Sequence, residues 1–253
     1  DPETGTETVL FQQQPAFDST GLSAELFTTR SSDGTEISYT VIGPEDGLED
    51  RPQRTLVYGY GGFDVSITPR YEPLFGKLWL EKGGIYVHAY LRGGGENGPK
   101  WHRSAMYENR LRPYEDMAAI LADLHARGIS SPVQTGIMGR SNGGLMVSAV
   151  MTRRPDLMNA VVVGGPLTDM LHYQNLDPGA SWTAEYGDPR RAADRAWIAR
   201  YSPYQALEKD ETYPVPLVIT STDDDRVLVG HARRFSARME ALGHESLYFE
   251  DRQ

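Results

Sequence analysis

The chain has 253 residues, with 25 Lys and Arg against 35 Asp and Glu, so its formal net charge is −10 at pH 7. This acidic balance argues against a nucleic-acid partner. Hydrophobic residues make up 39%, with 26 Gly and 16 Pro, which excludes collagen-like, coiled-coil and disordered classes. No apolar run approaches the roughly 18 residues of a membrane span, so we expect a soluble protein of the cytoplasm or periplasm with one large α/β domain.

The N-terminal residues lack a sustained hydrophobic period. Residues 1–21 are polar and include Gln12-Gln13-Gln14-Pro15, which indicates a connector, with the folded domain over residues 22–253. The chain opens with Asp1-Pro2-Glu3 and shows no signal-peptide pattern, so we expect it to be part of a longer protein. Cysteine is absent, which excludes disulfides and a thiolate nucleophile, and no cofactor or metal is expected.

The pattern of apolar residues predicts the fold class. Strands over residues 24–30 and 35–42 flank Asp33-Gly34, a pair that favours a hairpin turn. After Thr55, short apolar runs alternate with helical patterns. The runs predict strands over residues 55–60, 84–91, 133–138, 159–164, 215–220 and 246–250, and helices over 113–127, 142–152 and 230–242. This alternation predicts a mostly parallel sheet with helices on both faces and an antiparallel leading hairpin at one edge.

The strongest motif is Gly139-Arg140-Ser141-Asn142-Gly143, a G-x-S-x-G pattern between an apolar strand and a helical segment. In a strand-to-helix elbow the serine hydroxyl is exposed, and glycines avoid clashes with the neighbouring backbone. The helix N-terminus and the Asn142 N–H can then face a developing oxyanion. The alternative is a tight turn without function, but the strand before the motif and the helix after it favour Ser141 as a nucleophile.

A nucleophilic serine needs a carboxylate that orients a histidine base, in the chain order serine, acid, histidine. The predicted strand 215–220 opens onto Asp223-Asp224-Asp225, at the edge of the sheet where catalytic loops converge. The alternative for this cluster is an acidic turn that caps the following helix. Asp169, which follows an earlier strand, is the competing acid. Strand order favours the cluster at 223–225.

Only two of the six histidines, His231 and His244, follow this acidic cluster. His231 opens a predicted helix and is expected on the surface. His244 precedes the last predicted strand, which places it at the amino edge, away from the serine. We therefore expect both to be solvated and the catalytic base to lie beyond Gln253. The isolated chain is accordingly expected to hydrolyse substrates negligibly.

Two glycine-rich loops follow predicted strands. Residues 93–98 formally satisfy G-x-G-x-x-G, but no clear helix start follows at Pro99, so a nucleotide site is not expected. Residues 58–63 end a strand at the carboxyl edge, where hydrolases of this architecture build part of the oxyanion hole. The alternative for the second loop is a tight turn with aromatic core residues.

Five short blocks stand out along the chain. They are Tyr58-Gly59-Tyr60-Gly61-Gly62-Phe63, Arg92-Gly93-Gly94-Gly95-Glu96, Gly139-Arg140-Ser141-Asn142-Gly143-Gly144, Trp182-Thr183-Ala184-Glu185-Tyr186-Gly187 and Asp224-Asp225-Arg226-Val227. In this order the blocks resemble the hydrolase domain of the prolyl oligopeptidase family of serine peptidases, and the resemblance covers residues 22–253. It implies an α/β-hydrolase fold, with a β-propeller cap elsewhere in the parent protein that admits only short peptides.

The resemblance also implies roles for single residues. Ser141 corresponds to the nucleophile, Asp224 to the acid of the triad, and the Tyr60 hydroxyl with the Asn142 N–H to the oxyanion hole. Arg226 corresponds to a residue that holds a substrate carbonyl. The proline pocket of the family corresponds to Phe63, Leu167, Trp182 and Tyr186, for two of which, Trp182 and Tyr186, ordinary core packing is the alternative.

These residues predict a serine peptidase that cleaves short peptides on the carboxyl side of proline, since a flat, rigid proline ring suits an aromatic slot. One alternative is an esterase or acyl-peptide hydrolase with the same fold and the same Ser-His-Asp chemistry. The other is a hydrolase-fold binding module without catalytic activity. No nucleic-acid or membrane partner is expected.

Overall fold

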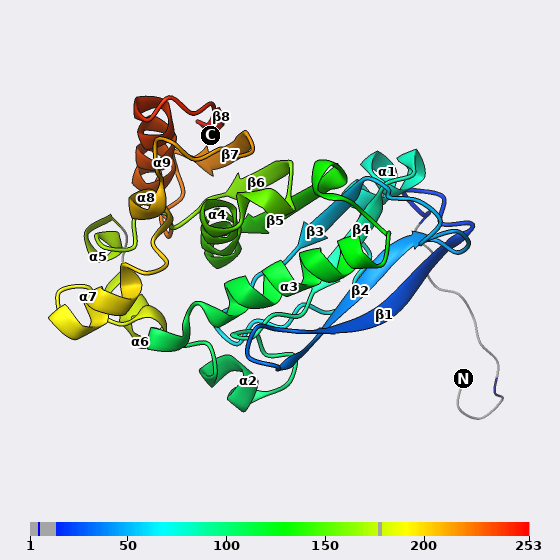
Figure 1. The fold of residues 1–253 in the computed structure, drawn as a ribbon, viewed down its shortest axis with the longest axis horizontal. Helices are drawn as coiled ribbons and strands as arrows, with labels where there is room; N and C mark the ends of the chain where they lie inside the picture. Colours follow the sequence, from blue (N-terminus) through cyan, green and yellow to red (C-terminus); the bar gives the residue numbers. More distant parts are fainter. Residues whose placement is uncertain (1–4, 6–13, 177–178, 253) are drawn as a thin grey trace.

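The computed structural model describes residues 5, 14–176 and 179–252. Its strands are β1 (Leu22–Arg30), β2 (Glu36–Pro44), β3 (Thr55–Tyr58), β4 (Ile85–Ala89), β5 (Thr135–Arg140), β6 (Ala160–Gly164), β7 (Pro216–Ser221) and β8 (Leu247–Asp251). Within this part of the chain they form one sheet in the order β1-β2-β4-β3-β5-β6-β7-β8. The pairs β1–β2 and β2–β4 are antiparallel and all other neighbours are parallel (Figure 1).

Helices cover the sheet from both sides. The α-helices are α1 (Pro73–Leu78), α2 (Pro99–Arg103), α3 (Arg112–Ala126), α4 (Asn142–Arg153), α5 (Tyr173–Leu176), α6 (Thr183–Tyr186), α7 (Ala192–Ile198), α8 (Pro203–Ala206) and α9 (Gly230–Ala241). Helices α3 and α4 lie across one face (Figure 1). Helix α1 packs on the other face, where Phe75 stacks on Tyr86 with ring centroids 4.7 Å apart. The predicted fold class is confirmed.

Short 3₁₀ turns also lie between the strands and helices. They are η1 (Leu80–Lys82), η2 (Tyr107–Asn109), η3 (Pro132–Gln134), η4 (Pro155–Leu157) and η5 (Gly179–Trp182). The prediction of a strand from residue 133 was wrong, because Pro132 starts a turn and β5 begins at Thr135. The expectation that no clear helix start follows at Pro99 was also wrong: Pro99 begins α2, a position that suits proline because the first helical N–H has no partner.

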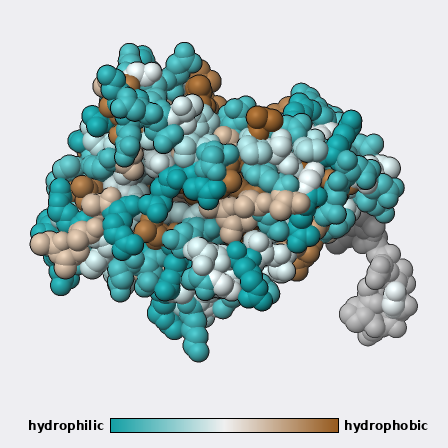
Figure 2. Space-filling view, viewed as in Figure 1, coloured by the Kyte–Doolittle hydropathy of each residue, from teal (hydrophilic) through white to brown (hydrophobic). Residues whose placement is uncertain are grey.

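The sheet core is apolar because its central strands are parallel and buried on the α4 side. Val57, Ile137, Val163 and Val218 are inaccessible to solvent, and in β3, β6 and β7 such buried residues alternate with more exposed ones. Figure 2 shows that the outer surface on the side of α3 and α4 is largely hydrophilic, with hydrophobic residues in small separate groups. Among the described residues, no helix is long and apolar enough to cross a membrane.

The predicted connector over residues 1–21 is only partly described, since residues 1–4 and 6–13 lie outside the described residues. Phe17, within the described part, stacks on Tyr71 at 5.4 Å and lies directly over Gly76 of α1. The Ala16 N–H donates to the Tyr71 hydroxyl at 2.6 Å. Residues immediately before β1 are therefore packed on the first helix.

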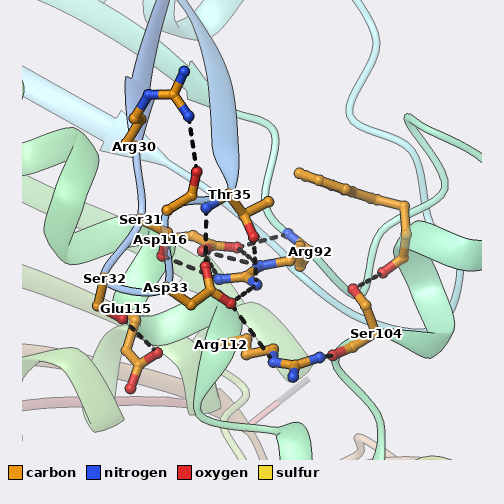
Figure 3. Close-up of polar contacts among 12 residues, drawn as sticks. Arg30, Ser31, Ser32, Asp33, Thr35, Arg92, Ser104, Arg112, Glu115 and Asp116 are labelled. Atoms are coloured by element: carbon orange, nitrogen blue, oxygen red, sulfur yellow. Dashed lines mark hydrogen bonds and ion pairs between the residues drawn. The ribbon is translucent and has the colours of Figure 1, made fainter.

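A buried arginine fastens the β1–β2 turn to helix α3 (Figure 3). Arg92, in the loop after β4, donates to Asp116 of α3 through Nη2 at 2.6 Å and through Nε at 2.9 Å. Its Nη1 donates to Asp33 and Thr35 of the turn, and its Nη2 also donates to Ser31. The Arg92 and Asp116 side chains are 3% and 0% exposed, so the Asp116 charge depends on Arg92 for its compensation, whereas Arg92 also pairs with Asp33.

Replacement of Arg92 by Met should lower the free energy of unfolding by about 3–5 kcal/mol, because Asp116 would remain buried and unpaired. The double variant Arg92→Met/Asp116→Leu should recover part of this loss, since it removes both charges. Urea unfolding of the single and double variants measures the difference. Additive losses in the double variant would contradict the assignment of Arg92 as the partner that compensates Asp116.

Candidate active site

Ser141 stands at the junction between β5 and α4, where the chain turns sharply. Its φ is +57°, a left-handed conformation that is strained for a residue with a side chain. The Ser141 N–H donates to the Gly164 carbonyl at 2.8 Å, and the Ser141 carbonyl accepts from Leu145 N at 3.1 Å. The strained residue is thereby fixed to β6 on one side and to α4 on the other, with its side chain half-buried at the carboxyl edge of the sheet.

Close backbone contacts explain the glycines of the motif. A Cβ on Gly139 would lie 2.2 Å from the Gly143 carbonyl oxygen, and one on Gly143 would lie 2.7 Å from the Gly59 carbonyl oxygen. No side chain fits at either distance. The predicted strand-to-helix elbow is therefore present, and α4 starts directly beneath the serine.

A cavity of about 360 Å³ opens beside Ser141. Its lining residues are Tyr60, Phe63, Ser141, Leu167, Ser181, Trp182, Tyr186, Arg226 and Val227. The structure thus brings together seven of the residues that the sequence predicts for the site, from loops that are far apart along the chain. Asn142 and Asp224 are not among the lining residues.

The Tyr60 hydroxyl lies beside the Ser141 side chain, and both residues line this cavity. Burial raises the pKa of Tyr60 above its usual range, although its hydrogen bond with the Ser141 side chain and the positive charge of Arg110 act in the opposite direction. A phenol with a raised pKa stays protonated at neutral pH. Tyr60 can therefore donate a hydrogen bond to an anion that forms at Ser141.

The walls of the cavity are aromatic and aliphatic. Phe63 packs edge-to-face on Tyr186 with ring centroids 5.5 Å apart, and Tyr186 also contacts Tyr173 at 5.7 Å. Leu167 and Tyr186 are buried, whereas Trp182 is half-buried and Arg226 is exposed. The cavity consequently offers an apolar slot with a cationic side chain at its rim.

The Asn142 side chain is buried and connects three parts of the site. Its Nδ2 donates to the Tyr60 carbonyl at 2.6 Å, and its Oδ1 accepts from the Tyr186 hydroxyl at 2.8 Å and from Arg110. The sequence pointed to the backbone N–H of Asn142 alone. The side-chain bonds add a direct link between the elbow, the Tyr60 loop and the aromatic wall.

Asp224 lies in the loop that follows β7, and its carboxylate is already partly engaged. Its Oδ1 accepts from the backbone N–H groups of Arg226 at 3.1 Å and Val227 at 3.0 Å. Asp223 and Asp225 are exposed, whereas Asp224 is half-buried. The carboxylate borders a separate cavity of about 630 Å³, which Gly165 and Ser221 also line.

Asp169, the competing acid, is fully buried and is surrounded by donors. It accepts from His172 Nδ1 at 3.0 Å and from Gln205 Nε2 at 2.6 Å, and it pairs with Arg234 at 2.7 Å. These bonds fix the loop after β6 against α8 and α9. Asp169 thus has three side-chain partners, whereas the bonds described above for Asp224 come from two backbone N–H groups.

The prediction of a solvated His231 was wrong, because the side chain is 0% exposed. Its Nδ1 accepts from the backbone N–H groups of Thr168 at 3.2 Å and Asp169 at 3.1 Å. The start of α9 packs directly on the loop after β6, which takes the imidazole into the interior. His244 precedes β8 at the amino edge, and its Nε2 bonds to the Glu208 carbonyl at 2.7 Å.

Two further residues, Arg110 and Glu185, were not predicted by the sequence reasoning. Both are buried and form an ion pair at 2.7 Å behind the cavity. A carboxylate between Trp182 and Tyr186, inside a block of expected pocket residues, was a usable signal for Glu185. No local pattern marks Arg110.

The mostly parallel sheet, the strained serine at the β5–α4 junction and the loops gathered at one sheet edge define an α/β-hydrolase. A model of the prolyl oligopeptidase family matches residues 75–252. The chain therefore belongs to the prolyl oligopeptidase family.

Similar proteins include several larger peptidases. An uncharacterized peptidase of Sinorhizobium fredii is 43% identical over 99% of this chain and 35% of its own length. A prolyl endopeptidase of Elizabethkingia miricola is 36% identical over 87% of this chain and 31% of its own length. The solved structure of a post-proline cleaving enzyme from Rickettsia typhi superposes with a TM-score of 0.91 at 35% identity, over 97% of this chain and 35% of that one. The chain spans about a third of the length of these relatives.

Replacement of Gly139 by Ala should unfold the elbow, because the added Cβ would meet the Gly143 carbonyl oxygen at 2.2 Å. Gly136→Ala on the same strand is the matched control, since its Cβ would meet nothing closer than 3.5 Å. Thermal unfolding should show a large loss for Gly139→Ala and a small change for Gly136→Ala. Equal melting temperatures for the two variants would contradict this account of the elbow.

Proposed function

We propose that this chain is the catalytic hydrolase part of a serine peptidase that cleaves short peptides after proline. The observation that carries the proposal is the cavity that joins Ser141 and Tyr60 to an aromatic slot formed by Phe63, Trp182 and Tyr186. The names of the Elizabethkingia and Rickettsia relatives, a prolyl endopeptidase and a post-proline cleaving enzyme, support the specificity.

In the proposed reaction, Ser141 Oγ attacks the carbonyl carbon of the scissile bond and transfers its proton to a histidine base. The carbonyl oxygen becomes an oxyanion, which would accept hydrogen bonds from the Tyr60 hydroxyl and the Asn142 N–H. The protonated base then gives its proton to the leaving amine, which departs as the acyl-enzyme forms. Water, activated by the same base, releases the acid product.

Asp224 is the proposed acid of the triad. Its Oδ1 is held by two backbone N–H groups, which would fix the orientation of the carboxylate toward a histidine. His231 and His244 both have bonds elsewhere. We therefore place the base outside these 253 residues, in the remainder of a longer peptidase in which a propeller cap would also restrict the length of the substrate.

The side chains that line the slot support the proposed preference for proline. A proline ring is rigid and apolar, so it can stack on the indole of Trp182 without a large loss of conformational entropy. Leu167 and Phe63 would close the slot around the ring, and Arg226 at the rim would bind a substrate backbone carbonyl. The slot is lined by uncharged side chains, which would disfavour a charged residue before the scissile bond.

Replacement of Ser141 by Ala in the full-length peptidase should abolish nearly all turnover and leave the melting temperature unchanged. A fluorophosphonate probe should label the parent enzyme at Ser141, and peptide mapping by mass spectrometry locates the label. Labelling at another residue, or normal turnover by the variant, would refute the proposal that Ser141 is the nucleophile.

Replacement of Trp182 by Ala should lower kcat/KM for proline amides about ten- to a hundredfold, from the loss of roughly 1.5–3 kcal/mol of stacking and buried area. Turnover of a small ester without proline should change little. The measurement compares amides with Pro, Ala, Arg or Phe before the scissile bond. A parent enzyme that prefers Arg or Phe would overturn the proline assignment, and one that cleaves only esters would favour the esterase alternative.

A further inference from the structure

Glu185 lies behind the cavity and accepts hydrogen bonds from three separate parts of the structure. Its Oε1 accepts from the Phe63 N–H at 2.9 Å and from Arg110 Nη1 at 2.7 Å. Its Oε2 bonds to His102 Nε2 at 2.7 Å. The Glu185 side chain is 5% exposed, so little water screens its negative charge from the neighbouring donors.

The bond to Phe63 matters because the backbone is strained there. Phe63 and Asp64 have φ values of +57° and +58°, in the left-handed region that side chains disfavour. Such conformations persist only where the surroundings hold them in place. The Glu185 carboxylate accepts the N–H of the first strained residue, and that residue carries one wall of the cavity.

Arg110 connects the same carboxylate to the elbow. The guanidinium is completely buried, with Nη1 on Glu185 and Nη2 on Asn142 Oδ1. Its central carbon also lies 4.9 Å from the centre of the Tyr186 ring, a distance at which a cation and an aromatic face attract. Asn142 in turn donates to the Tyr60 carbonyl at 2.6 Å.

The loop that carries Tyr60 is in close contact with Arg110 and Asn142 at Gly62. A Cβ at position 62 would lie 2.5 Å from Arg110 Nη2 and 2.6 Å from Asn142 Nδ2. The loop that carries Tyr60 and Phe63 therefore rests directly on the Arg110 guanidinium and the Asn142 amide. A shift of Arg110 would move both the hydroxyl beside Ser141 and the aromatic wall.

We infer that Glu185 and Arg110 are positioning residues, which together fix the positions of the oxyanion donors and of the aromatic slot. The inference rests on the proposed function, in which Tyr60 and Asn142 stabilise the oxyanion. Neither residue touches the substrate in this assignment. Glu185 holds Phe63 in its left-handed conformation. Arg110 bonds to both Glu185 and Asn142, so it fixes the position of the Asn142 amide relative to the Glu185 carboxylate.

Loss of a positioning residue should change the kinetics differently from loss of a residue that lines the slot. Loss of Trp182 weakens proline substrates selectively, whereas loss of the Glu185 charge should displace the oxyanion donors and so slow every substrate. Displacements on the order of 1 Å in an active site can lower rates about 10²-fold. We expect Glu185→Gln in the full-length peptidase to lower kcat about ten- to a hundredfold for both a proline amide and p-nitrophenyl acetate.

Two other variants complete the test. Arg110→Lys keeps the charge, but a single ammonium lacks the planar fork that reaches Glu185 and Asn142 together, so a similar loss is expected. Asp123→Asn is the matched control, because Asp123 also pairs with an arginine and accepts from a tyrosine, but its partners Arg127 and Tyr39 do not line the cavity. Its kcat and KM should stay within twofold of the parent values.

The crystal structure of Glu185→Gln gives a readout that needs no turnover. We expect the Phe63 backbone to leave its left-handed conformation and the cavity to change shape. A folded variant with unchanged Phe63 φ, or with kcat within twofold for both substrates, would overturn the positioning role. A selective loss for the proline amide would also overturn it. If the parent enzyme hydrolysed neither substrate, the proposed function would fail, and the Phe63 conformation would decide the present inference alone.

Discussion

Close contact between backbones at the start of α4 is the constraint on which the site depends. Gly139, Gly143 and Gly144 each lie where a Cβ would be within 3.0 Å of a carbonyl oxygen, from Gly143, Gly59 and Gly164 respectively. The ends of three neighbouring parallel strands are thus pressed around one helix N-terminus. Because side chains are absent at these contacts, the strained serine can stand at the junction while the loops after β3 and β6 approach it from both sides.

Such close packing leaves little room for water, so the polar groups beneath the loops must satisfy one another. The Asn142 amide bonds to Tyr60, Tyr186 and Arg110, and the Arg110 charge is balanced by Glu185. Buried ion pairs contribute little net stability compared with apolar packing, but removal of one partner is costly. A pair of this kind is therefore better suited to fixing the geometry of a site than to stabilising the domain.

Much of the fold and part of the site could be predicted from local patterns. The alternation of apolar runs located the strands to within a few residues, and G-x-S-x-G identified the elbow because its glycines are required by local backbone contacts. The burial of His231 could not be predicted from local sequence. The residue stands near the start of a helix, and it is buried because the loop after β6 packs on it. Arg110 was missed for the same reason, because its partners are 32 and 75 residues away along the chain.

The sequence by itself determined the elements whose cause is local: the parallel strands, the strained turn at Ser141, and the family to which the blocks point. Only the tertiary structure decided which polar side chains are buried together, and hence that Glu185 joins Phe63, His102 and Arg110. The physical reason is that hydrogen bonds and ion pairs act over a few ångströms in space. The number of residues between two side chains does not predict their distance in space, which is set only when the sheet brings the strand ends to one edge.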